Sequence, residues 1–166
     1  MKKIYEVIKI KQVVKEIQNE LIEVIGSPLD ASRIAHYFIG DDDREVFLVL
    51  CLNTNQKVIA VHRCHIGSLD GALISPREVF KACILNNARK IIVAHNHPST
   101  KLNPSPEDLE ITQTLLKAGK ILDIPLQDHI IINAEGDYFS FREEGFISRG
   151  RLINKNDAKL NLILHK

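Results

Sequence analysis

The feature that most constrains how this chain folds is a short apolar run that leads directly into two histidines. Residues 91–94 read Ile-Ile-Val-Ala, and His95, Asn96 and His97 follow at once. Such a short run, rich in β-branched residues, predicts a central strand with both faces covered. His95 and His97 are two apart on an extended segment, so their side chains are expected on the same side. Pro98 favours this geometry, because proline pushes the preceding residue toward extended backbone.

The sequence around this strand predicts helices interleaved with further strands. We expect helices at residues 28–38, from 76 onward and at 106–119, and strands at 5–10, 45–52, 58–66, 126–133 and 138–141. Interleaved elements, some of them hairpins, are typical of an α/β (α+β-like) domain with one mixed sheet. We therefore expect a single domain at residues 28–150. An N-terminal extension (1–27) of strand or helix would precede it, and a basic C-terminal tail (151–166) would follow it.

Composition places the chain among ordinary globular proteins. It has 166 residues, 45% hydrophobic and 26% charged, enough for one domain with a proper core. A net charge of +1 gives no overall field toward nucleic acid or an anionic membrane. No apolar run reaches the roughly 18 residues of a membrane span, and the N-terminus lacks the apolar core of a secretory signal. Cys51, Cys64 and Cys83 form no disulfide pattern, so we expect reduced thiols in a cytoplasmic protein.

A serine and an aspartate follow the histidines at a spacing that suits a metal site. Ser105 begins the third expected helix, and Asp108 lies in its first turn, where the helix dipole favours an ionised carboxylate. Two imidazoles and a carboxylate with a free fourth position are typical of catalytic zinc. Taken separately, Ser105 and Asp108 predict a helix cap, and the histidines a polar strand end. Capping requires no imidazole pair one loop earlier, so the joint spacing favours the metal.

Two glutamates in an identical Arg-Glu-Val-Phe context, Glu45 and Glu78, are candidates for the base that activates water. Glu78 lies three residues after Ser75, so a capping box already explains it. Glu45 begins a strand after an acidic loop and has no such local explanation, which makes it the better candidate. From the residues alone, an exposed carboxylate at the edge of a strand is an equal alternative for Glu45.

Together these residues resemble the RadC-like branch of the JAB/MPN (JAMM) metalloprotease superfamily, over about residues 28–150. The shared pattern is His95-Asn96-His97, then Ser105 and Asp108, with Glu45 as the upstream acid. The resemblance implies that His95, His97 and Asp108 bind Zn²⁺ and that Glu45 shuttles protons. Ser105 would donate a hydrogen bond to the oxyanion. The implied fold is a curved mixed sheet flanked by helices, with a cytidine-deaminase-like architecture.

The resemblance implies a zinc-dependent hydrolase of the metallopeptidase or isopeptidase type, with a peptide or isopeptide substrate that the sequence does not name. One alternative is a DNA-repair-associated or nucleic-acid-binding protein, with Lys101, Lys117, Lys120 and the basic tail as a local patch. A non-catalytic MPN scaffold is another, although such relatives typically lack a metal ligand. Residues 1–27 show no glycine-containing hairpin of the kind that precedes this domain in longer members, so we expect a catalytic-type domain with a short extension.

The chain departs from the family at Thr100, where glycine is usual, and at Leu102, where proline is usual. A β-branched residue in place of a glycine with positive φ would be strained or would reroute the loop, which affects the groove beside the ligands. Outside the motif, His129 is expected to be a satisfied, partly buried histidine rather than a residue that lines the groove.

Overall fold

The computed structural model describes residues 4, 12–13, 15–16, 24–67, 74–99 and 101–153. They build one five-stranded mixed sheet in the order β2-β1-β3-β4-β5, in which only β3 and β4 run parallel. The strands are β1 (Val46–Leu52), β2 (Val58–Ile66), β3 (Lys90–His97), β4 (Leu126–Asn133) and β5 (Tyr138–Ser140). The helices are α1 (Pro28–Ile39), α2 (Pro76–Leu85) and α3 (Pro106–Ile121). The expected α/β fold with a mixed sheet flanked by helices is thus confirmed, whereas the expected strand at 5–10 lies outside the described residues.

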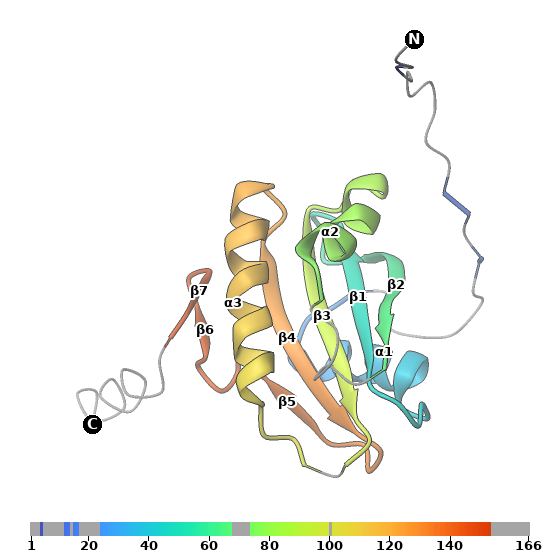
Figure 1. Ribbon diagram of the computed structural model, residues 1–166, viewed down its shortest axis with the longest axis vertical. Helices are drawn as coiled ribbons and strands as arrows, with labels where there is room; N and C mark the ends of the chain where they lie inside the picture. Colours follow the sequence, from blue (N-terminus) through green and yellow to red (C-terminus); the bar gives the residue numbers. More distant parts are fainter. Residues whose placement is uncertain are drawn as a thin grey trace.

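The sheet has a helical layer on each face, α2 and α3 in front and α1 behind (Figure 1). Every residue of β1 is buried, and alternate side chains enter the two cores. Phe47, Val49 and Cys51 pack in the α2/α3 layer, while Leu48 and Leu50 pack in the α1 layer. The neighbouring β3 is divided in the same way. Two covered faces explain why both strands read as continuous apolar runs without polar alternation.

Helix α3 ends at Ile121, close to Gly119 as expected. Gly119 is needed for a close approach rather than for a turn: a Cβ there would lie 2.5 Å from the carbonyl oxygen of Ile124. The chain that enters β4 therefore passes directly over the end of α3. This contact holds the helix tightly against the sheet.

The start of α2 departs from expectation. Ser75 is the N-cap, but its side chain makes no capping hydrogen bond, so the predicted capping box with Glu78 is wrong. The N-cap ψ is 130° at Ser75, compared with 163° at Ser27 and 165° at Ser105, where capping boxes do close. The backbone at Ser75 therefore aims its hydroxyl differently, although the residue types fit the pattern.

Both expected domain boundaries have ordered chain beyond them. Ile25 is buried, and its N–H donates to the carbonyl of Gln56. At the other end, β7 (Arg151–Leu152) pairs with β6 (Ile147–Ser148) in a small second sheet. The boundaries at residues 28 and 150 remain predictions, and residues 154–166 of the expected tail lie outside the described part. Within the described residues, no helix combines the length and apolar character needed to cross a bilayer.

Candidate metal centre

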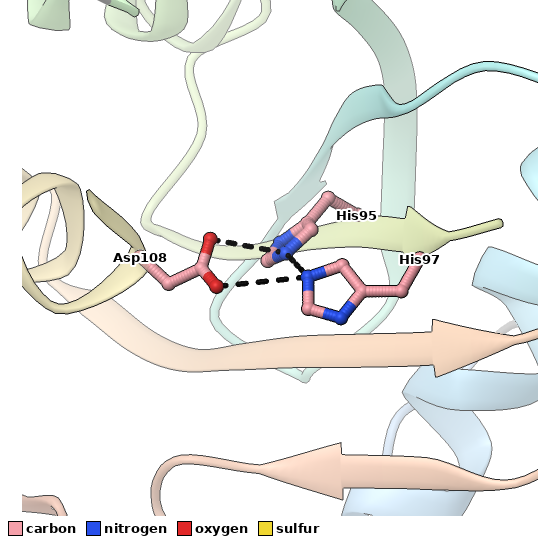
Figure 2. Close-up of side chains that lie close together, drawn as sticks. All are labelled: His95, His97 and Asp108. Atoms are coloured by element: carbon pink, nitrogen blue, oxygen red, sulfur yellow. Dashed lines mark hydrogen bonds and ion pairs between the residues drawn. The ribbon is translucent and has the colours of Figure 1, made fainter. Parts of the chain in front are cut away.

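The two histidines lie at the carboxyl end of β3, on the face that α3 covers. His95 pairs with Phe47 of β1 on one side and with Ile131 of β4 on the other. His97 follows two residues later and projects from the same face of the strand, as the spacing predicts. Asp108 is the third residue of α3 and reaches back toward both rings (Figure 2). The crossover from β3 through α3 thus delivers all three side chains to one point.

The ligand atoms of these three side chains lie within 4.8 Å of one another. The Nε2 atoms of His95 and His97 are 2.9 Å apart. His95 Nε2 lies 3.1 Å from Asp108 Oδ1, and His97 Nε2 lies 3.6 Å from Asp108 Oδ2. Two ligands bound tetrahedrally to zinc at about 2.0–2.1 Å are about 3.3–3.4 Å apart. The observed separations bracket that value, so the three groups have the spacing of a metal site.

Burial and neighbouring groups set the charges at this point. Burial opposes ionisation of Asp108, but its contacts with His95 and His97 hold the pKa of the carboxyl well below its ordinary value, so Asp108 is ionised. Burial also disfavours the charged form of His97 and by itself would lower the pKa of that imidazole. Contacts with Asp108 and the Lys101 carbonyl, together with the charge of Glu45, outweigh burial and raise this pKa overall. The site thus combines one fixed negative charge with two imidazoles.

The orientation of the lone pairs supports a metal rather than a network of hydrogen bonds. His97 Nδ1 lies 2.7 Å from the carbonyl oxygen of Lys101, which can only accept, so Nδ1 carries the proton and Nε2 presents a lone pair. Asp108 Oδ1 is buried and accepts no hydrogen bond from the residues that the structure describes, although His95 Nε2 lies 3.1 Å away. A buried carboxylate oxygen without a donor is costly unless a cation faces it. The residues therefore fit a divalent metal ion.

Ser105 lies directly beside the site as the N-cap of α3. Its Oγ accepts from the N–H of Asp108 at 3.1 Å, and its own N–H donates to Asp108 Oδ2 at 2.7 Å. This reciprocal pair confirms the predicted capping interaction. The cap uses Ser105 Oγ as an acceptor, which leaves the hydroxyl proton for another partner.

Glu45 lies in the segment that enters β1, and its side chain is partly buried. Its carbonyl accepts from the N–H of Gly67, which fixes the backbone beside the end of β2. Its carboxylate is close enough to His97 to raise the pKa of that imidazole. Glu78, by contrast, is exposed on α2, and its charge acts on His62 and Cys64 instead. The structure thus brings Glu45, and not Glu78, toward His97 of the candidate metal site.

Comparison with protein families agrees with this geometry. The model of the RadC-like JAB domain matches residues 25–146, which contain all of the residues above. The chain belongs to the RadC-like JAB domain family. The match begins three residues before the expected boundary, at the buried Ile25.

Relatives of the family from bacteria and archaea are similar over the same region. UPF0758 proteins from Rubrobacter xylanophilus and Thermotoga maritima are each 43% identical, over 75% and 79% of this chain and 54% and 60% of their own length. The UPF0758 protein of Methanosarcina barkeri is 37% identical over 74% of this chain and 53% of its own. The chain thus spans little more than half the length of these relatives.

The two departures from the family pattern lie in the loop between β3 and α3. Thr100 is outside the described residues. Leu102 is partly buried and packs against the core on the α2/α3 face of the sheet. Lys101, between them, supplies the carbonyl that orients His97. In this RadC-like JAB domain the loop thus supplies a carbonyl partner for the second histidine.

Asn96 is a buried polar residue beside the site that the motif spacing does not single out. It lies between the two histidines and faces the other side of β3, where it is buried. Its Oδ1 accepts from the N–H of Val46 at 2.7 Å, and its Nδ2 donates to the carbonyls of Asp42 and Arg44 at 3.0 and 2.9 Å. These bonds tie the segment that carries Glu45 to the histidine strand. The available signal was an amide at an inward-facing position of a covered strand.

His129 on β4 and Thr112 on α3 also contribute to the centre. We expected His129 to be partly buried; it is fully buried, and burial lowers its pKa well below the ordinary value. It is satisfied by hydrogen bonds, as expected, but one partner is the metal-site residue His95. The distances are 2.8 Å from His129 Nε2 to His95 Nδ1 and 2.6 Å from His129 Nδ1 to Thr112 Oγ1. Sequence separations of 34 and 17 residues left no local signal for these contacts.

Proposed function

We propose that this domain is a metal-dependent hydrolase that cleaves amide bonds, in a peptide or an isopeptide substrate. The observation that carries the proposal is the convergence of His95 Nε2, His97 Nε2 and the Asp108 carboxylate at one largely buried point. Membership of the JAB family supports the same reading. Two imidazoles, one carboxylate and a position free for substrate favour zinc among the common divalent ions.

When bound, zinc supplies a Lewis acid that polarises a carbonyl and makes water nucleophilic near neutral pH. The chain's own residues then have separate tasks. His95, His97 and Asp108 hold the ion. Glu45, whose carboxylate lies within electrostatic reach of His97, accepts the proton of the attacking water and returns it to the departing amine.

Ser105 stabilises the charge that develops on the substrate carbonyl oxygen. Its Oγ already accepts from the Asp108 N–H, so its hydroxyl proton can be given to this oxyanion without loss of the cap. A preorganised donor of this kind is commonly worth about 3–4 kcal/mol of the barrier. The cap also holds Ser105 beside Asp108, so oxyanion donor and metal ligand move as one unit.

The test is the variant Glu45→Gln, with Glu78→Gln as its matched control in the same Arg-Glu-Val-Phe context. Zinc-loaded proteins are screened against a peptide library that includes isopeptide-linked peptides. We expect wild type and Glu78→Gln to cleave, and Glu45→Gln to bind zinc without turnover. Turnover by Glu45→Gln at the wild-type rate would refute its assignment as the base. Metal content near zero in wild type purified without chelator would support a scaffold instead.

A second candidate function, binding of a polyanion such as nucleic acid, has one observation in its favour. A cavity of about 540 Å³ between α3 and the β6–β7 hairpin is lined by four basic side chains: Lys117, Lys120, Arg149 and Arg151. Among the described residues that line it, Asp123 is the sole carboxylate, and it pairs with Arg89 at 3.1 Å. Lys101 of the expected patch does not line this cavity.

Fluorescence anisotropy with a labelled oligonucleotide tests this candidate across a range of salt concentrations. Binding should weaken steeply with salt, and Lys120→Ala should lower the slope of log K against log salt by about 1. Lys81→Ala, on the exposed side of α2, is the matched control. Binding that is absent, or equal in the two variants, would remove the candidate.

A further inference from the structure

A line of four polar groups runs from His95 into the protein and ends at the helix that carries Asp108. His95 Nδ1 lies 2.8 Å from His129 Nε2, and His129 Nδ1 lies 2.6 Å from Thr112 Oγ1. Thr112 Oγ1 lies 2.5 Å from the main-chain carbonyl oxygen of Asp108. We propose that Thr112 and His129 are positioning residues that fix the tautomer of His95, so that its Nε2 lone pair faces the metal. This inference rests on the proposed metal site.

The direction of the line follows from its far end. The carbonyl of Asp108 can only accept, so the hydroxyl proton of Thr112 is given to it. Threonine within a helix commonly donates in this way to the carbonyl four residues earlier. With its one proton committed, Thr112 Oγ1 can offer His129 only a lone pair. His129 Nδ1 must therefore be the N–H that donates to Thr112.

The position of the proton on His129 in turn decides which nitrogen of His95 carries a proton. The His129 ring is fully buried, and its two nitrogens contact an imidazole and a hydroxyl rather than a carboxylate. A neutral imidazole ring carries one proton, and Thr112 holds that proton on Nδ1 of His129, so its Nε2 is the acceptor toward His95. His95 must then donate from Nδ1, which leaves a lone pair on its Nε2. This is the nitrogen that lies 3.1 Å from Asp108 Oδ1. Its lone pair faces that of His97 Nε2 at 2.9 Å with no proton between them, an arrangement that is favourable only with a cation at this point.

Aromatic packing keeps both rings from turning out of this arrangement. The His129 ring stacks on Phe141 with centroids 4.7 Å apart and planes 9° apart. Phe47 packs parallel to His95 at 6.2 Å and edge-on to His129 at 5.7 Å. His97 differs, because a carbonyl of the neighbouring loop orients it directly. The orientation of His95 is thus fixed by His129 on β4 and Thr112 on α3. Both are uncharged in this arrangement, so they add no negative charge to the proposed metal site.

The experiment compares Thr112→Val, Thr112→Ser and a matched control, Thr114→Val, on the same helix. Valine has the shape of threonine but offers no lone pair, so His129 loses the acceptor that holds its proton on Nδ1. We expect part of the population to move protons, with His129 donating from Nε2 and His95 carrying hydrogen on Nε2, where it blocks the metal. Imidazole ¹⁵N spectra of the metal-free proteins report the two tautomers of His95 directly. Co²⁺ affinity, from competition with a chromophoric chelator, and the visible Co²⁺ spectrum report the consequence.

The expected result is a mixed His95 tautomer and a roughly tenfold loss of Co²⁺ affinity in Thr112→Val, at the lower end for loss of an outer partner. Thr112→Ser and Thr114→Val should resemble wild type in both measurements. A pure wild-type tautomer with unchanged Co²⁺ affinity in Thr112→Val overturns the inference and leaves the metal site standing. A wild-type protein that binds no Co²⁺ refutes the metal site itself and, with it, the positioning role.

Discussion

Helices α1 and α3 begin with the same local device, yet only one of them lies at a candidate active site. Each starts with serine and proline and has an aspartate three residues after the serine: Ser27 with Asp30, and Ser105 with Asp108. Both capping boxes close. At α1, Asp30 Oδ2 accepts hydrogen bonds from the N–H groups of Gly26 and Ser27 and from the Ser27 hydroxyl, at 2.9–3.0 Å. All three of these bonds lie at the N-terminus of α1, so this oxygen serves the helix cap.

At α3 the same carboxylate is divided between two tasks. Asp108 Oδ2 accepts from the Ser105 N–H, while Oδ1 is turned toward His95. Asp108 is fully buried, whereas the box of Asp30 is open to solvent. The serine hydroxyl differs as well, because Ser27 Oγ donates to its aspartate, whereas Ser105 Oγ accepts from the Asp108 N–H. Burial beside two imidazoles, and not the serine-aspartate pair itself, thus distinguishes Asp108 as a candidate metal ligand and Ser105 as a candidate donor.

The largest effect should come from neutralising the two aspartates in turn. Asp108→Asn removes the ionised ligand, and we expect zinc affinity to fall by more than the roughly 100-fold that marks the upper range for an outer partner. Asp30→Asn should leave zinc affinity unchanged. Competition titration with a chromophoric chelator measures both. Equal zinc affinity in the two variants would refute the assignment of Asp108 as a metal ligand and would mean that it only caps its helix.

A smaller and more specific effect is expected for the two serines. Ser27→Ala and Ser105→Ala should each lower the free energy of unfolding by about 1 kcal/mol, since each removes one cap. Only Ser105→Ala should also slow hydrolysis, by about 10²–10³-fold, because it removes the oxyanion donor. Thermal unfolding and turnover of zinc-loaded protein separate the two contributions. Unchanged turnover in Ser105→Ala would leave this serine with its cap alone.

The smallest effect should come from the N-terminus of α2, where the serine is present but its capping bond is missing. Ser75 makes no side-chain capping bond, so Ser75→Ala should change the free energy of unfolding by less than about 0.5 kcal/mol. Chemical denaturation of this variant beside Ser27→Ala measures the difference. A loss as large as that of Ser27→Ala would show that Ser75 does cap α2 in solution.

The sequence predicted the fold well where one local rule decides the outcome. The covered strands β1 and β3 follow from their apolar runs, and the first residues of the helices follow from their serine-proline pairs. The proximity of His95, His97 and Asp108 followed from their spacing across one strand–loop–helix unit. Ser75 shows the limit of such rules, because its letters fit a capping box while the incoming backbone prevents it.

The surroundings of the ligands were not predictable in this way. His129 joins His95 through the pairing of β4 with β3, and Thr112 joins His129 through the packing of α3 on the sheet. Neither contact leaves a trace in the residues near the motif. Asn96 was treated as a spacer because spacing alone does not say what the opposite face of a strand touches.

Because Asn96 lies between the two histidines, the proposed site depends on the correct register of β3 in the sheet. A slip of β3 by a single residue would turn both imidazoles away from α3 and bring the amide there in their place. Two neighbours oppose such a slip, because β3 is laddered to β1 and to β4 at once. With β3 out of register, the proposed metal site would lose both imidazoles, and the segment that carries Glu45 would lose its hydrogen bonds to Asn96. For the proposed metal site, metal uptake during refolding would therefore report the correct register of β3.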